Sequence, residues 1–196
     1  MIVRSVAKIL QRRLQTLYGL DDVPCVGDYV TLAGPGEREQ LLLREMDEDY
    51  VELCLVVPDC PLRDALVPSA LSDSYLQVVE GVSHFVLVAE RIRVGRPTSQ
   101  LELELQAEVD KLVLIQHCLG ALPQHASVNL HHKLYGQVRF LHPAGSELGD
   151  RYRLANRLAA RFTRQLGRLN TQERRALLRR FYQMDLSEKI RLAEAA

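Results

Sequence analysis

The stretch EGVSHF (80–85) contains two side chains that can bind metal ions. Glu80 and His84 are four residues apart, and on a helix such residues lie on the same face. A second pair with this spacing, Glu104 and Glu108, follows in the next stretch with helical character. An imidazole together with carboxylates is a ligand set suited to zinc or iron. If the two helices pack antiparallel, the spacing predicts a metal site made of His84, Glu108 and Glu80.

The order of elements around these residues resembles that of the zincin metallopeptidases. In that family a small sheet precedes a helix carrying His-Glu-x-x-His, and many members take a third ligand, a glutamate, from the following helix. Residues 26–118 show a similar order, EGVSH stands where the motif would be, and LQAEVDKLVLI resembles the third-ligand helix. The resemblance implies a zincin-like fold in which His84 matches the second histidine and Glu108 the third ligand of a zinc ion.

Two departures from the zincin motif bear on activity. Glu80 stands where the first histidine ligand belongs, and Gly81 stands where the family has its catalytic glutamate. That glutamate would take a proton from the zinc-bound water. The resemblance therefore implies a zincin-like scaffold without peptidase activity. A divergent metal-dependent hydrolase that uses His84 and Glu108 is the alternative, so the sequence leaves open whether the protein is an enzyme.

A simpler interpretation of the same residues needs no metal. A histidine in an apolar stretch such as VSHFVLV is often a core residue bonded to a neighbouring carboxylate or backbone carbonyl. Glu108 is three residues from Lys111 and can form an ion pair with it. A solvated helix face is the simplest interpretation of three further acidic residues, Glu102, Glu104 and Asp110.

A row of arginines, which we call the arginine ridge, follows one side of a predicted helix near the C-terminus. Its members step by four, four, three and four residues: Arg153, Arg157, Arg161, Arg164 and Arg168. Guanidinium groups bind carboxylates and phosphates through paired hydrogen bonds. The ridge therefore predicts an anionic ligand: nucleic acid, an anionic membrane surface, an acidic protein or the chain's own acidic part.

The distribution of charge separates these alternatives in part. Residues 151–196 contain 12 Lys and Arg against 4 Asp and Glu, a net charge of +8, whereas the preceding residues have 13 against 21, a net charge of −8. The isoelectric point is about 7.0, no nucleic-acid-binding motif is present, and the aromatic residues are scattered instead of spaced for base stacking. These features disfavour nucleic acid. They favour an acidic protein partner, with internal pairing to residues such as Glu104 as the alternative.

Composition indicates a globular protein. Hydrophobic residues make up 47% and charged residues 26% of the 196, as in ordinary folded domains. No apolar run approaches the roughly 18 residues that span a bilayer, and the N-terminal residues lack the features of a secretory signal. The four cysteines match no zinc or redox spacing. We therefore expect reduced thiols and a cytoplasmic location.

The hydrophobic pattern predicts an α+β fold. A first helix with an apolar stripe ends at Gly19, and residues 26–32 and 40–57 form strands of a small antiparallel sheet. Further helices are predicted at 72–92, 99–119 and 149–169, with two short closing helices after Asn170 and Asp185, while 129–141 stays ambiguous. We expect one domain over 1–196, with a possible subdivision into an α+β part (1–142) and a basic helical part (149–196).

No intact catalytic set accompanies this charge asymmetry. The sequence therefore favours a non-catalytic cytosolic binding protein, acting as an adaptor or regulator with an acidic protein partner. The metal-dependent hydrolase and a nucleic-acid-binding protein that uses the arginine ridge are the alternatives.

Overall fold

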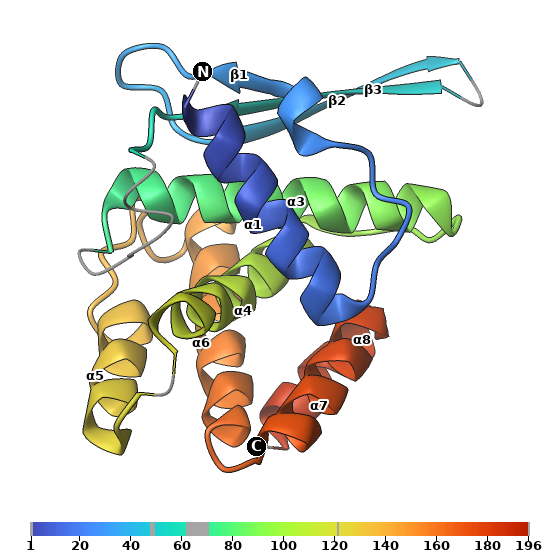
Figure 1. Cartoon of the computed structure of the whole chain (residues 1–196). Helices are drawn as coiled ribbons and strands as arrows, with labels where there is room; N and C mark the ends of the chain where they lie inside the picture. Colours follow the sequence, from blue (N-terminus) through green and yellow to red (C-terminus); the bar gives the residue numbers. More distant parts are fainter. Residues whose placement is uncertain (1, 48–49, 62–70, 121, 196) are drawn as a thin grey trace. The chain divides into compact units, whose positions relative to one another are not determined.

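The computed structural model describes the chain except for residues 1, 48–49, 62–70, 121 and 196 (Figure 1). Its contacts group the chain into two compact units. Unit 1 comprises Met1–Thr16 and Leu20–Pro97, and unit 2 comprises Leu17–Gly19 and Thr98–Ala196. The subdivision considered near residues 143–149 thus falls inside unit 2.

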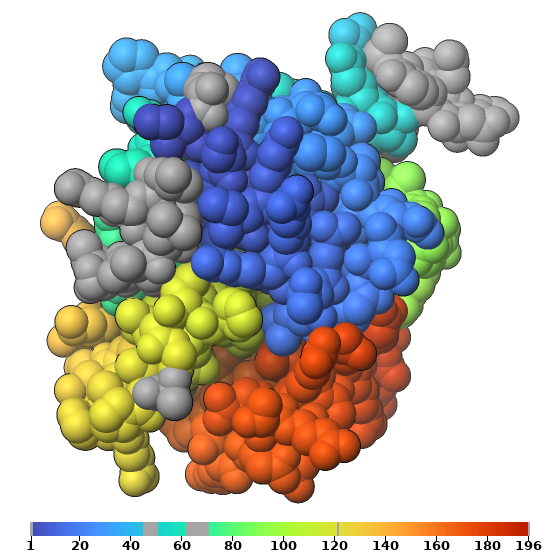
Figure 2. Space-filling model, viewed as in Figure 1, coloured from blue at the N-terminus to red at the C-terminus, as the bar shows by residue number. Residues whose placement is uncertain are grey.

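The first predicted helix is confirmed as α1, Ile2–Tyr18. Its apolar stripe is buried at Val6, Leu10 and Leu14, none of which has measurable solvent exposure. Gly19 follows with a φ of +72°, a left-handed conformation that glycine adopts without strain and that commonly ends a helix. The opposite side of α1 lies at the surface of unit 1 (Figure 2).

Unit 1 contains a three-stranded sheet in the order β1-β3-β2. The strands are β1 Val30–Leu32, β2 Gln40–Asp47 and β3 Tyr50–Val57. The predicted antiparallel pair within 40–57 is confirmed, because β2 and β3 pair antiparallel from Gln40 opposite Val56. However, β1 pairs parallel with β3, so the sheet is mixed and not wholly antiparallel. Strand β3 lies between the other two, which places β1 and β2 on opposite edges of the sheet.

Part of the predicted strand at 26–32 is not extended. Residues Val26–Asp28 form the short 3-10 helix η1, and only Val30–Leu32 join the sheet. The buried Gln11 of α1 holds this turn, because its side-chain oxygen accepts from the Val26 backbone N–H at 2.9 Å and its amide donates to the Pro24 carbonyl at 2.6 Å. The α+β class is nevertheless confirmed.

Helix α3, Asp73–Arg93, packs against the sheet, and Figure 1 shows α1 and α3 on the same face of it. The Ser72 side chain caps α3 by accepting from the Tyr75 backbone N–H at 3.3 Å. The helix is buried over most of its length, from Tyr75 to Arg91. This burial explains why residues 72–92 show a continuous apolar run and no clear amphipathic stripe.

Unit 2 consists of helices. They are α4 Gln100–Leu119, α5 Gln124–Tyr135, α6 Glu147–Leu166, α7 Thr171–Gln183 and α8 Leu186–Glu194. Helix α6 packs against α4, α5 and α8, and the Phe162 ring of α6 stacks on Phe181 of α7 with ring centroids 3.9 Å apart. The ambiguous stretch 129–141 is helical up to Tyr135 and then leaves α5. None of the described helices is both long and apolar enough to cross a membrane.

Both closing helices begin where their capping residues predict. Asn170 with Glu173, and Asp185 with Glu188, form complete capping boxes at the starts of α7 and α8. In each box the two residues satisfy backbone N–H groups that a helix start leaves without partners. The backbone N–H of Glu188 and the hydroxyl of Ser187 donate to the Asp185 carboxylate and lower its pKa.

The lowered pKa of Asp185 predicts an acid-sensitive contribution to stability. A carboxylate with a pKa below its unfolded value of 3.8 stabilises the fold above that pH and loses the contribution as the pH falls through its folded pKa. Asp185→Asn keeps the capping oxygen but cannot titrate. We expect wild type to exceed this variant in urea midpoint at neutral pH and to lose the advantage in acid. An equal difference at both pH values would contradict the assignment.

Candidate functional site

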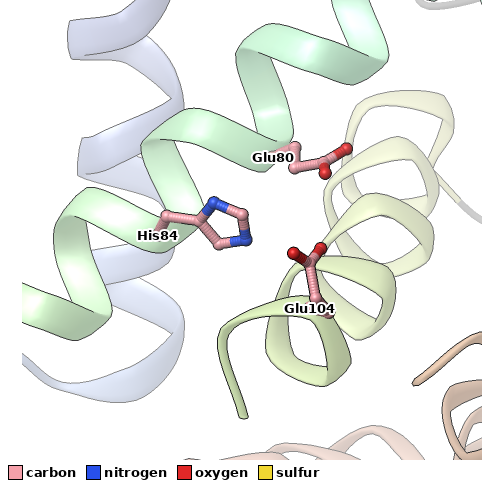
Figure 3. Close-up of side chains that lie close together, drawn as sticks. All are labelled: Glu80, His84 and Glu104. Carbon is pink, nitrogen blue, oxygen red and sulfur yellow. The ribbon is translucent and has the colours of Figure 1, made fainter. Parts of the chain in front are cut away.

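Glu80 and His84 occupy successive turns of α3 in unit 1, and Figure 3 shows both side chains directed to the same side of the helix. A carboxylate oxygen of Glu80 lies within 4.8 Å of a His84 ring nitrogen. The predicted shared face is therefore confirmed. The third side chain drawn in Figure 3, Glu104, is carried by α4 and belongs to unit 2.

The carboxylate bonded to His84 comes from Glu39, just before β2. His84 Nδ1 lies 3.3 Å from Glu39 Oε1, and both side chains are buried, with 8% and 9% of their surfaces exposed. The Glu39 backbone N–H donates to Gln77 Oε1 of α3 at 3.0 Å, which ties this segment to the helix. The prediction of a core histidine bonded to a carboxylate is confirmed. Because Glu39 is 45 residues away and outside any motif, sequence reasoning did not find it.

Gly81 has a steric role at this contact. A Cβ atom at Gly81 would lie 2.8 Å from Glu39 Cγ and 2.8 Å from Leu55 Cδ1, closer than carbon atoms pack. The absence of a side chain therefore allows Glu39 and the sheet to approach α3. The space that a side chain at position 81 would need is occupied by Glu39.

Glu108, the other predicted metal ligand, lies on α4 in unit 2. Its carboxylate is 2.8 Å from Lys111 Nζ, so the predicted ion pair is confirmed. Its backbone carbonyl accepts from the Tyr135 hydroxyl at 2.8 Å. Since His84 and Glu108 belong to different units, the ligand set of His84, Glu80 and Glu108 stays a prediction.

The prediction that α4 presents a solvated acidic face is wrong. Glu102, Glu104 and Asp110 have exposed fractions of 3%, 5% and 1%. Two of these acidic residues bind polar side chains of unit 2: Lys189 of α8 lies beside Glu102, and Tyr18 donates to Asp110. The sequence signal for this burial is that α4 has apolar residues on nearly every side, which is typical of a helix buried all round.

Lys189 is the most enclosed charge in the described part of unit 2, with no measurable exposure. Its Nζ lies 3.0 Å from Glu102 Oε1 and 3.2 Å from Gln106 Oε1. The ring of Phe181 lies 5.4 Å away on another side. A buried charge requires such partners, because transfer from water costs several kcal/mol for an unpaired ion.

Tyr18 and Asp110 extend this network. The Tyr18 hydroxyl donates to Asp110, while Gln106 Nε2 donates to Asp110 Oδ1 and to the Tyr18 oxygen, each at 3.0 Å. Burial, and then the negative charge of Asp110, raise the pKa of Tyr18 well above its ordinary value. The phenol therefore stays protonated and remains a donor. Because protein covers these atoms, the network stabilises the unit and offers no surface to a substrate.

Four of the five arginines in the ridge are exposed: Arg157, Arg161, Arg164 and Arg168. The helix predicted to run to residue 169 ends as α6 at Leu166, so Arg168 lies in the turn that follows it. Arg153 differs from the exposed four. Its guanidinium donates to the carbonyls of His142 at 3.0 Å and Gly149 at 2.9 Å and lies 4.6 Å from the Phe140 ring centroid. Arg153 thus anchors the loop before α6, and the surface ridge consists of the other four.

In the described part of the chain, the side chains of these four exposed arginines form no ion pair or hydrogen bond. The internal pairing that the sequence allowed is therefore not observed for them. Two acidic residues of α4 have lysine partners instead: Glu108 pairs with Lys111 of the same helix, and Glu102 pairs with Lys189 of α8.

Comparisons of the chain with protein-family models, with curated proteins and with solved structures gave no match. The zincin-like fold therefore stays a prediction, and the chemistry of these side chains is the basis for assigning function.

Gly81→Ala tests the close approach of Glu39. Overpacking at the 2.8 Å contacts outweighs the better helix propensity of alanine, so we expect a loss of roughly 1–3 kcal/mol in the free energy of unfolding. Gly167→Ala is the control, because the nearest atom to a Cβ there is the Arg164 carbonyl oxygen at 3.5 Å. Equal effects of the two variants in urea unfolding would contradict the steric role.

Lys189→Met tests the buried ion pair. The variant leaves Glu102 buried without its cation, and we expect a loss of roughly 3–5 kcal/mol in unfolding free energy. Lys189→Met combined with Glu102→Gln removes both charges and should recover a substantial part of that loss. A single variant within about 1 kcal/mol of wild type in chemical denaturation would show that the pair is not a major stabilising contact.

Proposed function

We propose that this protein is a non-catalytic cytosolic binding protein whose ligand is an acidic segment of a partner protein. The binding surface is formed by the four exposed arginines of the ridge: Arg157, Arg161, Arg164 and Arg168. The observation that carries this proposal is the exposure of all four guanidinium groups without a carboxylate partner in the described part of the chain.

The spacing of the ridge suits a linear anionic ligand. On α6, steps of four and three residues separate Arg157, Arg161 and Arg164 by about 4.5–6 Å each along the helix axis, about 10 Å in all. Arg168 follows in the turn after the helix. Alternate side chains of an extended peptide recur every 6–7 Å or so, and a second helix repeats with the same rise as α6. A carboxylate every second residue of an extended segment, or every third to fourth of a helix, can therefore meet successive guanidinium groups.

Two features favour an acidic protein over nucleic acid. Single-stranded nucleic acid is usually held by exposed aromatic rings as well as cations. On α6, however, Phe162 is fully buried against Phe181, and Tyr152 is half-buried with its ring stacked near His142 at 5.9 Å between centroids. The balanced overall charge, with an isoelectric point of about 7.0, also differs from the basic surface of most nucleic-acid-binding domains.

The buried acidic residues support an external ligand. A carboxylate inside the protein that already binds a lysine, such as Glu102, would lose that partner by turning toward a surface arginine. Breaking a buried ion pair costs several kcal/mol, whereas a surface pair returns about 1 kcal/mol or less. The chain's own buried carboxylates are therefore poor competitors for the ridge.

Binding of a fluorescent glutamate-rich peptide, measured by anisotropy at several salt concentrations, tests the function. We expect replacement of all four ridge arginines by glutamine to weaken binding roughly 10- to 100-fold, because each solvent-exposed pair contributes up to about 1 kcal/mol. The matched control replaces four exposed cations elsewhere by glutamine: Lys8, Arg12, Arg44 and Arg180. This control should retain most of the affinity.

Two outcomes would contradict the proposal. Equal losses in the ridge and control variants would show that binding follows net charge and not the ridge. Tighter binding of a single-stranded or duplex oligonucleotide of matched charge, with a steep salt dependence, would assign the ridge to nucleic acid instead.

A further inference from the structure

A second site lies within unit 1, where α3 faces the segment before β2. Two carboxylates lie near His84 there: Glu80, with an oxygen within 4.8 Å of a His84 ring nitrogen, and Glu39, whose Oε1 lies 3.3 Å from Nδ1. Glu39 and His84 are buried, and Glu80 is half-buried. None of the three belongs to the arginine ridge, so a ligand held by them is independent of the proposed partner binding.

Glu39 fixes the orientation of the His84 ring. Its Oε1 lies 3.3 Å from Nδ1, so the carboxylate accepts the proton that Nδ1 carries in the corresponding tautomer. With Nδ1 protonated, the other nitrogen, Nε2, carries the lone pair that a metal ion requires. A carboxylate behind a ligating histidine is the usual arrangement at protein zinc sites, where it fixes the ring and increases its basicity.

The backbone and Gly81 hold Glu39 in this position. Its N–H donates to the Gln77 side chain at 3.0 Å, and Gln77 Nε2 in turn donates to Asp73 Oδ2 at 2.7 Å. The missing side chain at Gly81 provides the space that Glu39 Cγ occupies. Contacts with α3 therefore hold the Glu39 segment close to His84.

Glu80 is the carboxylate that shares a helix face with His84. It lies one helical turn before His84, and its carboxylate comes within 4.8 Å of a ring nitrogen. Two donor atoms that are both bound to one zinc ion at about 2 Å lie roughly 3–4 Å apart, so a small rotation of the Glu80 side chain brings them into range.

We propose that His84 and Glu80 bind a divalent transition-metal ion of the zinc class, with Glu39 as the residue that positions the histidine. Nitrogen from imidazole with carboxylate oxygen suits zinc, cobalt(II) and iron(II) better than magnesium or calcium, which prefer all-oxygen ligand sets. Water or further carboxylates complete the coordination.

Titration of the tag-free, full-length protein with Co²⁺ tests this site. Visible d–d absorption reports nitrogen and oxygen coordination directly, and competition with Zn²⁺ gives the relative affinity. We expect a saturable spectrum that Glu80→Gln and His84→Gln abolish. Glu39→Gln should weaken binding roughly 10- to 100-fold while preserving the bands, because it acts on the ligand and not on the metal.

Two exposed residues of the same types provide matched controls, His132→Gln and Glu52→Gln, and both variants should bind as wild type. Circular dichroism verifies the fold of each variant. If the His84→Gln variant fails to fold, the Glu80→Gln variant tests the site. Glu80 is half-buried, and glutamine has nearly the same shape as glutamate, so this variant should fold. Folded wild type that binds no Co²⁺, or Glu80→Gln with undiminished binding, would overturn the proposal.

Discussion

The buried ion pair between Lys189 and Glu102 is a central constraint on unit 2. It joins α8 to α4 at 3.0 Å with almost no exposure of either side chain. Such a pair is tolerated only when both charges are matched and further hydrogen bonds satisfy their remaining groups, and Gln106 meets part of this requirement. The polar face of α4 therefore belongs to the core.

The four exposed arginines of the ridge have no such partner among the described residues. Because Glu102 and Glu108 each already have a lysine partner, the positive charge on α6 is not neutralised by them. The four exposed guanidinium groups remain at the surface, where they meet solvent and any acidic ligand. In unit 1 the corresponding requirement is steric. Because Gly81 has no side chain, Glu39 can approach α3 and contact His84.

Local patterns in the sequence predicted much of the fold. The stripe that ends at Gly19 predicted α1, and the capping residues Asn170 and Asp185 predicted the starts of α7 and α8, because these signals act over a few residues. The parallel pairing of β1 depends on the strand order, which no local pattern encodes. The Glu39–His84 contact joins residues 45 positions apart. It depends on a glycine whose steric role becomes visible only in three dimensions.

The same limit applies to the charges. Sequence spacing found the Glu108–Lys111 pair and the arginines of α6, since each set lies within one helix. It also placed Arg168 on that helix, although α6 ends at Leu166. It placed Glu102 and Asp110 in solvent, because their partners Lys189 and Tyr18 come from distant segments. Arg153 shares the ridge spacing, yet backbone carbonyls of the preceding loop occupy it. The most direct measurement of ligand binding by the ridge is NMR of the arginine Nε–H resonances while a glutamate-rich peptide is added. We expect saturable shifts at Arg157, Arg161, Arg164 and Arg168, with Arg153 and Arg12 unchanged, whereas shifts spread evenly over all arginines would contradict a ridge-specific site.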